Sequence, residues 1–375
     1  MKIYTPLNKG MVLCIVLLAA ISSIPSSSST TIGNYRLIGE SETLYVGGSG
    51  GNNYTSIQAA LNDSNDCDTI FVYSNPDPYY EHIIIDTSID LIGENKETTS
   101  IDGEEIGDVI TVLADSVTII GFTIQNGGDG IMADAGIEIH SNYNSINGNI
   151  IANNGWFGLY LNASSNNNIE NNLVYSNGME GVFLNGSTDN IIHNNEMFYN
   201  FHCAIVTRDS RYNKIIDNEM YENHATVSLW SGSLYNEIAY NSMHNHEWSG
   251  MGIWEGSDNN YVHHNHFYDN LLFGITIKGA EGNVVERNII SGSEKGITLS
   301  FCTSTVIKQN NFIDNDIHAY FDNSSRNRWM RNYWGDQVKI RPKIIRGETS
   351  LPWNPSRTIH WFNLDMFSAR NPYEL

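Results

Sequence analysis

Three ionisable side chains recur at one point of a repeating pattern and have the residue types needed for proton transfer. His202, His224 and Glu247 are separated by 22 and 23 residues. If the chain repeats with this period, neighbouring coils place them about 4.8 Å apart, the spacing of adjacent strands. Histidines and a carboxylate at this separation can act as acid and base on one bound substrate. We therefore take His202, His224 and Glu247 as candidate catalytic residues.

Aromatic side chains accompany these residues and indicate a binding surface. The recurring loops carry Trp156 and Trp248 where polar turns are expected. Aromatic faces match the apolar faces of sugar rings, and flanking polar groups fix the orientation of the sugar. One interpretation is a glycan-binding groove, and the other is that these loops fold back as hydrophobic cover. In the first interpretation the candidate ligand-binding residues are Trp156, Tyr160, Phe183, Arg208, Trp248, Glu255 and Lys278.

A repeat of 22 to 24 residues built on asparagine must position these side chains. One column is Asn in nine repeats out of nine: Asn149, Asn172, Asn195, Asn218, Asn241, Asn265, Asn288, Asn310 and Asn332. Such a period is typical of a solenoid, in which each coil packs against the next. Stacked asparagines can pair amide to amide along the axis, which satisfies polar groups that are costly to bury alone. Asparagine also tolerates the left-handed conformation that a tight bend requires.

Apolar columns between the asparagines identify short strands. Ile192 and Ile215 belong to one such column, and Met197, Met220 and Met243 belong to the next. Both columns must face inward, and their residues favour strands. Helical repeats of this length would show a period of about 3.6 residues, which is not found here. The sequence therefore predicts an all-β fold, a parallel β-helix with an N-terminal helical cap and a C-terminal cap outside the repeat.

A third strand in each coil alternates between inward and outward residues. Alternation places Tyr160 outward in its coil. In two later coils we expect Trp230 and Trp254 to occupy one inward column. The other inward column there holds the small residues Ser228 and Gly252, which would keep the core volume constant.

The methionines and cysteines are not expected to form a metal site on this repeat. Met197, Met220 and Met243 are expected in the core. Cys203 and Cys302 lie four coils apart, about 19 Å, which is too far for a disulfide. We therefore expect no metal requirement for folding and no required cofactor. Ca²⁺ remains an option as a bridge to a uronate polymer.

The composition limits the classes of partner. The chain has 42 acidic and 20 basic residues and a formal net charge of -22. This charge repels phosphate backbones and anionic lipid headgroups, which argues against nucleic acid as a partner. Only 17% of residues are charged, so the polar surface is largely amide and hydroxyl. Such a surface suits a polysaccharide or glycan, and the net charge favours a neutral or cationic polymer.

The segments outside the repeat predict export. Residues 1–25 resemble a signal peptide, because Lys2 and Lys9 precede an apolar run shorter than the ~20 residues of a membrane span. We expect cleavage, with no membrane insertion afterwards; retention of the segment as an anchor is the alternative. Residues 26–42 form a Ser/Thr-rich tether, 43–140 the N-terminal cap and first coils, 141–336 the regular repeats, and 337–375 a C-terminal cap. The expected location is extracellular, at the cell surface.

Several of these segments together resemble a known family. They are SIQAALNDSNDCDTIFVYS, YYEHIIIDTSIDLIGEN, the N-x-I-x-x-N coils and the closing NYWGD. They look like NosD-type and carbohydrate-binding/sugar-hydrolase β-helix proteins, particularly exported archaeal members. The resemblance covers residues from about 43 to 375 and implies a right-handed parallel β-helix in an exported protein. It implies function weakly, because this scaffold supports many activities.

The functional prediction is carbohydrate binding at the cell surface or envelope. The GHG and paired-Asp signatures of pectin-type hydrolases, the DPH of uronate epimerases and the R-x-P-x-x-R of pectate lyases are all absent. A polysaccharide-modifying enzyme, whether lyase, epimerase or glycoside hydrolase, is the alternative. A structural or adhesive surface protein and a NosD-like accessory protein of a metal pathway are further alternatives.

Overall fold

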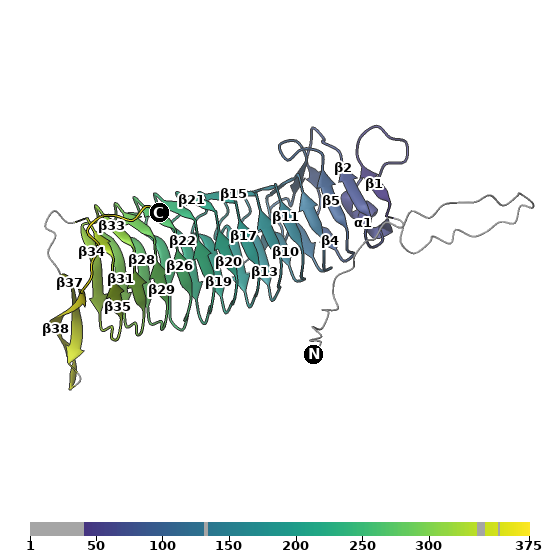
Figure 1. Cartoon of the computed structure of the whole chain (residues 1–375). Helices are drawn as coiled ribbons and strands as arrows, with labels where there is room; N and C mark the ends of the chain where they lie inside the picture. The colour runs from purple at the N-terminus through teal and green to yellow at the C-terminus, as the bar shows by residue number, and fades with distance from the viewer. Residues whose placement is uncertain (1–40, 131–133, 336–341, 352) are drawn as a thin grey trace, which may run out of the picture. The chain divides into compact units, whose positions relative to one another are not determined.

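The computed structural model describes residues 41–375, except 131–133, 336–341 and 352. Within this part the chain winds into successive coils, each built from short strands (Figure 1). Each coil strand pairs in parallel with the equivalent strand one coil away. The fold is an all-β right-handed parallel β-helix, as the sequence predicts. The predicted signal peptide and most of the predicted tether lie outside the described residues.

The strands make three faces. The long-strand face contains β4 (Ile83–Ile85), β7 (Ile110–Val112), β10 (Ala135–Ile139), β13 (Phe157–Asn162), β16 (Val182–Asn185), β19 (Cys203–Arg208), β22 (Ala225–Trp230), β25 (Ser249–Ile253), β28 (Phe273–Lys278), β31 (Lys295–Ser300) and β34 (Ile317–Asp322). The middle face contains β1 (Thr43–Val46), β2 (Thr69–Val72), β5 (Asp90–Gly93), β8 (Thr118–Ile120), β11 (Ser145–Asn147), β14 (Asn168–Glu170), β17 (Ile191–His193), β20 (Lys214–Ile216), β23 (Glu237–Ala239), β26 (Tyr261–His263), β29 (Val284–Glu286), β32 (Val306–Lys308) and β35 (Arg328–Met330).

From β2 onward, the twelve-strand face follows the middle face in each coil. It contains β3 (Tyr79–Tyr80), β6 (Ser100–Asp102), β9 (Thr123–Gln125), β12 (Ile150–Ala152), β15 (Leu173–Tyr175), β18 (Glu196–Phe198), β21 (Glu219–Tyr221), β24 (Ser242–His244), β27 (His266–Tyr268), β30 (Ile289–Ser291), β33 (Asn311–Ile313) and β36 (Tyr333–Trp334).

The asparagine columns are buried ladders of hydrogen bonds, as the sequence predicts. The side chain of Asn218 donates to Asn241 Oδ1 at 3.0 Å and to the carbonyl of Ile192 at 2.9 Å. Its own Oδ1 accepts from the side chain of Asn195 at 3.0 Å. Each amide therefore joins three coils, and its removal would leave buried groups unpaired.

The left-handed bends lie beside the ladder rather than on it. The residue before a ladder asparagine has φ near +55°: 54° for Asp217, 57° for Tyr240 and 53° for His264. The expectation that the ladder asparagines themselves adopt this conformation is therefore wrong. They are required for their amide hydrogen bonds, whereas the bend accepts several residue types.

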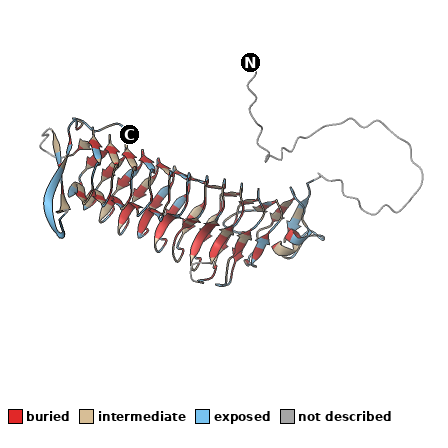
Figure 2. Ribbon diagram, turned by 90° about the horizontal axis from the view of Figure 1, so that it is seen from below, coloured by how far each residue is buried: buried red, intermediate tan, exposed pale blue. Residues whose placement is uncertain are grey.

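The interior is a continuous apolar core, shown as buried strands in Figure 2. Met197, Met220 and Met243 are each 0% exposed, which confirms their predicted place in the core. On the long-strand face, Val227 and Leu229 point inward beside Met251 and Ile253. Each coil thereby buries apolar side chains against the next, which is the main source of its stability.

Non-repeating segments lie at both ends of the described coils. The helix α1 (Ile57–Asp63) packs against β1, β2 and β4, and Ser56 caps its N-terminus. At the other end, β37 (Lys343–Leu351) and β38 (Asn354–Asp365) form an antiparallel hairpin. Asp365 Oδ2 accepts hydrogen bonds from the backbone and side chain of Asn332, at 2.8 and 3.1 Å, so a carboxylate ends the ladder.

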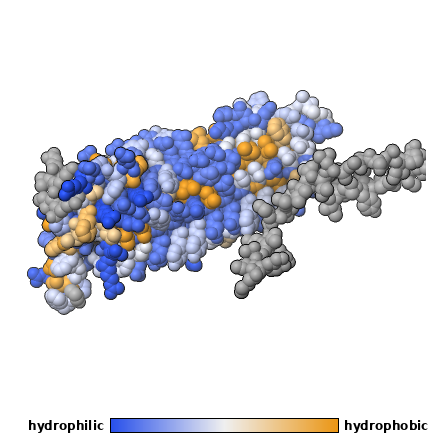
Figure 3. Space-filling view, in the orientation of Figure 1, coloured by the Kyte–Doolittle hydropathy of each residue, from blue (hydrophilic) through white to orange (hydrophobic). Residues whose placement is uncertain are grey.

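The surface is largely hydrophilic, with separate apolar patches (Figure 3). Most of β38 is exposed, including Trp361 and Phe362. Within the described residues, no helix has the length and apolar character that a membrane span requires.

Candidate functional site

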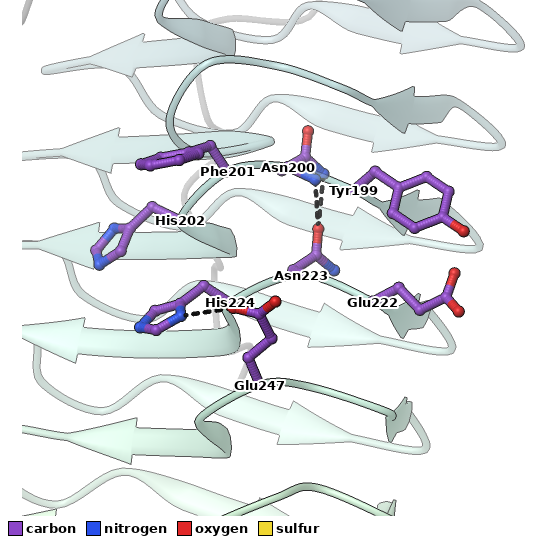
Figure 4. Close-up of a pocket in the computed structure, with 8 residues that line it drawn as sticks. All are labelled: Tyr199, Asn200, Phe201, His202, Glu222, Asn223, His224 and Glu247. Atoms are coloured by element: carbon purple, nitrogen blue, oxygen red, sulfur yellow. Dashed lines mark hydrogen bonds and ion pairs between the residues drawn. The ribbon is translucent and has the colours of Figure 1, made fainter.

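The three candidate catalytic residues line one hollow of about 490 Å³. It lies where the chain passes from the twelve-strand face to the long-strand face in three successive coils (Figure 4). We call it the corner hollow; its lining residues are Tyr199, Asn200, Phe201, His202, Glu222, Asn223, His224 and Glu247. The repeat therefore brings His202, His224 and Glu247 together.

His202 is held in a charged state by its surroundings. Its Nδ1 lies 2.7 Å from Oε1 of Glu180, which is buried. A hydrogen bond with the sulfur of Cys203 and the pairing with Glu180 raise the pKa of His202 to about 10. At neutral pH His202 is a fixed cation, so it is poorly suited to exchange a proton with a substrate.

His224 and Glu247 form a looser pair in the same hollow. His224 Nδ1 lies 3.5 Å from Glu247 Oε2, and the Glu247 side chain is 81% exposed. Both groups reach solvent without a buried partner that fixes them. This is the pair in the corner hollow that can meet a substrate and transfer a proton.

A row of stacked rings leads from the corner hollow onto the long-strand face. The ring centroids of His202 and His224 lie 6.2 Å apart, and those of His224 and Trp248 lie 6.1 Å apart. Trp248 stacks on Trp254 at 5.5 Å with an interplanar angle of 3°. Trp254 in turn lies 5.6 Å from Trp230. The row crosses successive coils without a break in ring contact.

The three tryptophans line a second hollow, of about 480 Å³. We call it the tryptophan hollow; its residues are Trp230, Ser231, Trp248, Trp254, Glu255 and Lys278. Trp230 is 42% exposed, while Trp248 and Trp254 are half-buried. Three of the candidate ligand-binding residues, Trp248, Glu255 and Lys278, therefore meet at one place.

Trp230 and Trp254 lie on the outer surface, so the expectation that they face inward is wrong. The strand pairing aligns Thr207 with Leu229 and Arg208 with Trp230. A shift of one residue reverses the two faces of a strand, and both alternations of β22 contain a large apolar residue. Gly252 leaves the space that Trp254 occupies, since a Cβ there would lie 2.6 Å from the indole Nε1. An outward aromatic pair spaced by 24 residues is the signal that sequence reasoning missed.

Trp156, Tyr160 and Phe183 form a separate cluster closer to the N-terminus. Tyr160 stacks on Phe183 at 5.4 Å, and Phe183 stacks on Phe157 at 4.9 Å. Tyr160 is only 7% exposed, and Trp156 and Phe183 pack against the same buried group. The aromatic side chains thus cover the outer face here, whereas they border an open hollow around Trp248.

Arg208 lies between these two groups of rings. It is exposed at the end of β19, one coil from Trp230. In the described part of the chain, neither Arg208 nor Lys278 has a carboxylate within ion-pair distance. These two positive charges are open to a ligand.

The coils and this outer face define a parallel β-helix protein with an aromatic surface on its long strands. The chain belongs to the NosD family: the family model described as "Periplasmic copper-binding protein (NosD)" matches residues 61–272 and 247–361. No curated protein matches the chain significantly.

Solved structures with the same fold have low sequence identity to this chain. The A-module of the Azotobacter vinelandii mannuronan C-5 epimerase AlgE6 is 13% identical with a TM-score of 0.54, covering 74% of this chain and 88% of its own. The Dettilon tailspike protein is 13% identical with a TM-score of 0.62, covering 78% and 68%. A double mutant of the periplasmic alginate epimerase AlgG is 12% identical with a TM-score of 0.53, covering 75% and 83%. At this identity the likeness shows the shared fold.

The described residues do not provide a binding site for the copper that the family description names. They include no group of three or more His, Cys, Asp or Glu side chains that could hold a metal ion. Met220 and its neighbours in the column are buried in the core, and Cys203 and Cys302 are buried thiols that form no disulfide. His263 and His264 bring their Nδ1 atoms within 2.8 Å, but His263 Nε2 is already bound to Glu237.

Proposed function

We propose that this protein binds a polysaccharide on its long-strand face, at the tryptophan hollow. The observation that supports this is the stack of Trp230, Trp254 and Trp248 beside Glu255 and Lys278. Indole faces offer flat apolar area for sugar rings, and the carboxylate and ammonium groups can hydrogen-bond to hydroxyls. The hollow lies on a strand face that continues over neighbouring coils, which suits a polymer better than an enclosed small molecule.

The related proteins make a glycan the most suitable class of ligand. The structures of similar fold include epimerases whose names state mannuronan and alginate as substrates. The description of the NosD family and the name of the AlgG epimerase both state a periplasmic location. This supports an exported protein at the cell surface or in the envelope. Ca²⁺ is proposed only as a bridge to a uronate chain, because carboxylate oxygens are its preferred ligands.

Modification of the bound polymer is the second candidate function. The exposed pair of His224 and Glu247 lies next to Trp248 in the ring row, so a bound chain could extend into the corner hollow. Glu247 would then serve as base or acid, while His202 contributes a fixed positive charge.

A glycan-array screen of the mature protein, followed by titration of the best ligand, tests the proposal. Trp254→Ala should weaken binding by about tenfold or more, since it removes the central ring of the stack. Trp353→Ala is the matched control, because Trp353 lies in the hairpin region and is 80% exposed. Unchanged affinity in Trp254→Ala, with an unchanged melting temperature, would refute binding at this hollow.

A second pair of assays separates a binding protein from an enzyme. Glu247→Gln keeps the size of the side chain and removes its charge. Loss of polymer turnover with retained binding in this variant would support catalysis in the corner hollow. If the wild-type protein binds the polymer and never changes it, the enzyme candidate is wrong. If no glycan binds, a structural or adhesive role replaces both.

A further inference from the structure

Basic residues on different faces of this acidic protein have different surroundings. The chain has 20 basic residues against 42 acidic ones, so its carboxylates outnumber its positive charges. On the middle face, Lys214 pairs with Glu237 at 3.1 Å and Lys308 pairs with Glu286 at 3.0 Å. Arg208 and Lys278 instead project from the long-strand face without such a partner among the described residues. Both lie beside the tryptophans.

Arg208 and Lys278 occupy equivalent positions at the ends of their strands. The register places Arg208 opposite Trp230, and it aligns Leu229 with Ile253 and Ile253 with Ile277. Trp230, Trp254 and Lys278 directly follow Leu229, Ile253 and Ile277 in the sequence. Together with Arg208 they form one outer column: Arg208, Trp230, Trp254 and Lys278. Two rings are thus flanked by two cations over four consecutive coils.

The spacing of this column matches a polymer that carries regular negative charges. At about 4.8 Å per coil, Arg208 and Lys278 lie about 14 Å apart along the axis. This is about the length of three residues in an extended chain of pyranose sugars. A chain along the axis would place sugar rings on Trp230 and Trp254 and acidic groups at both cations.

We infer that the polysaccharide is acidic, with carboxylates about three sugars apart bound by Arg208 and Lys278. This inference rests on the proposed function, and it names the class of polymer. Arginine binds a carboxylate through two parallel hydrogen bonds, and lysine supplies a compact positive charge. Glu255, in the same hollow, is left to accept hydrogen bonds from hydroxyls.

The local charges here oppose the overall charge of the protein. The net charge of -22 favours a neutral or cationic polymer at long range, and salt screens that effect. Direct contacts with the two cations would act at short range, where salt screens them less, so they decide specificity. An acidic polymer should therefore bind better when moderate salt screens the long-range repulsion.

Binding of polyuronates and of their carboxyl-reduced counterparts tests this inference. Polygalacturonate and alginate are each compared with the neutral polymer made by reducing their carboxyl groups, at equal length and with a chelator to exclude Ca²⁺ bridging. At least one acidic form should bind about tenfold more tightly than its reduced form. Arg208→Gln and Lys278→Gln should each remove most of that difference, because each should weaken binding of the acidic form much more than binding of the reduced form. Lys214→Gln, on the middle face, is the matched control and should behave as wild type.

The outcomes distinguish this inference from the proposed function. If every reduced form binds as well as its acidic form, or if no acidic form binds, the inference is wrong. The proposed function still stands in that case if Trp254→Ala weakens binding of the glycan that does bind. The double variant Arg208→Gln/Lys278→Gln gives a further test. If it still binds the acidic polymer more tightly than the reduced one, the two cations do not recognise the carboxylates and the inference is also wrong.

Discussion

His246→Asn should remove a specific sensitivity of this protein to acid. A separate buried ladder contains Asn200, Asn223 and Asn270, and His246 takes the place of an asparagine between Asn223 and Asn270. It is 1% exposed, and its Nε2 contacts the carbonyl of Met220 at 3.1 Å. An asparagine at this position can accept from the Asn223 backbone and donate to Asn270, as the other ladder members do.

The magnitude follows from the titration of the buried ring. Burial lowers the pKa of His246 from 6.5 to about 4. The unfolded chain therefore binds more protons than the folded one between these values. Stability is fully present above pH 6.5 and is lost as the pH falls toward 4. At about 1.4 kcal/mol per pH unit, His246 alone costs about 3 kcal/mol between pH 7 and pH 4.

Urea unfolding at about pH 7 and about pH 4 measures this difference. His246→Asn should lie within about 1 kcal/mol of wild type at neutral pH and lose about 3 kcal/mol less on acidification. His360→Asn is the matched control, because the His360 side chain is 95% exposed. If His246→Asn and wild type lose the same stability on acidification, His246 is not held neutral in the ladder and the reasoning is wrong.

Three further outcomes are expected. Asn218→Leu should lower the free energy of unfolding by a few kcal/mol, since amides on both sides lose partners; an unchanged urea midpoint would contradict the ladder. Exhaustive chelation should leave the melting temperature unchanged, and a large fall would reveal a structural metal. Burial and the nearby Glu138 raise the pKa of Asp108 from 3.8 to about 7, so stability falls as the pH rises between these values. Asp108→Asn should therefore raise the melting temperature at pH 8 but not at pH 4, and an equal effect at both would refute the assignment.

The coils could be predicted from the sequence because one physical requirement recurs in every repeat. Each ladder asparagine bonds to the next coil, as Asn195 does to Asn218, so the period is visible in single residues. The apolar columns follow from the same register, which is why Met220 could be assigned to the core. The bends were less predictable, since a left-handed residue such as Tyr240 needs only to tolerate its conformation.

The tryptophan hollow could not be predicted, because it depends on a one-residue choice of register and on side-chain packing. In β22 either Val227 and Leu229 or Ser228 and Trp230 could point inward, because each pair has enough side-chain volume to fill the core. Only packing against the neighbouring coils decides between them. Trp254 packs over Gly252, two residues earlier, and this contact also depends on which face of the strand points outward. The corner hollow could be predicted more readily, because His202 and His224 recur with the period of the repeat.

A crystal structure of the protein with an oligosaccharide of the polymer that binds best would test the central claim most directly. We predict electron density for sugar rings stacked on Trp230 and Trp254, with the chain running along the axis of the coils. Density for the oligosaccharide on another face, with the tryptophan hollow empty, would contradict the claim.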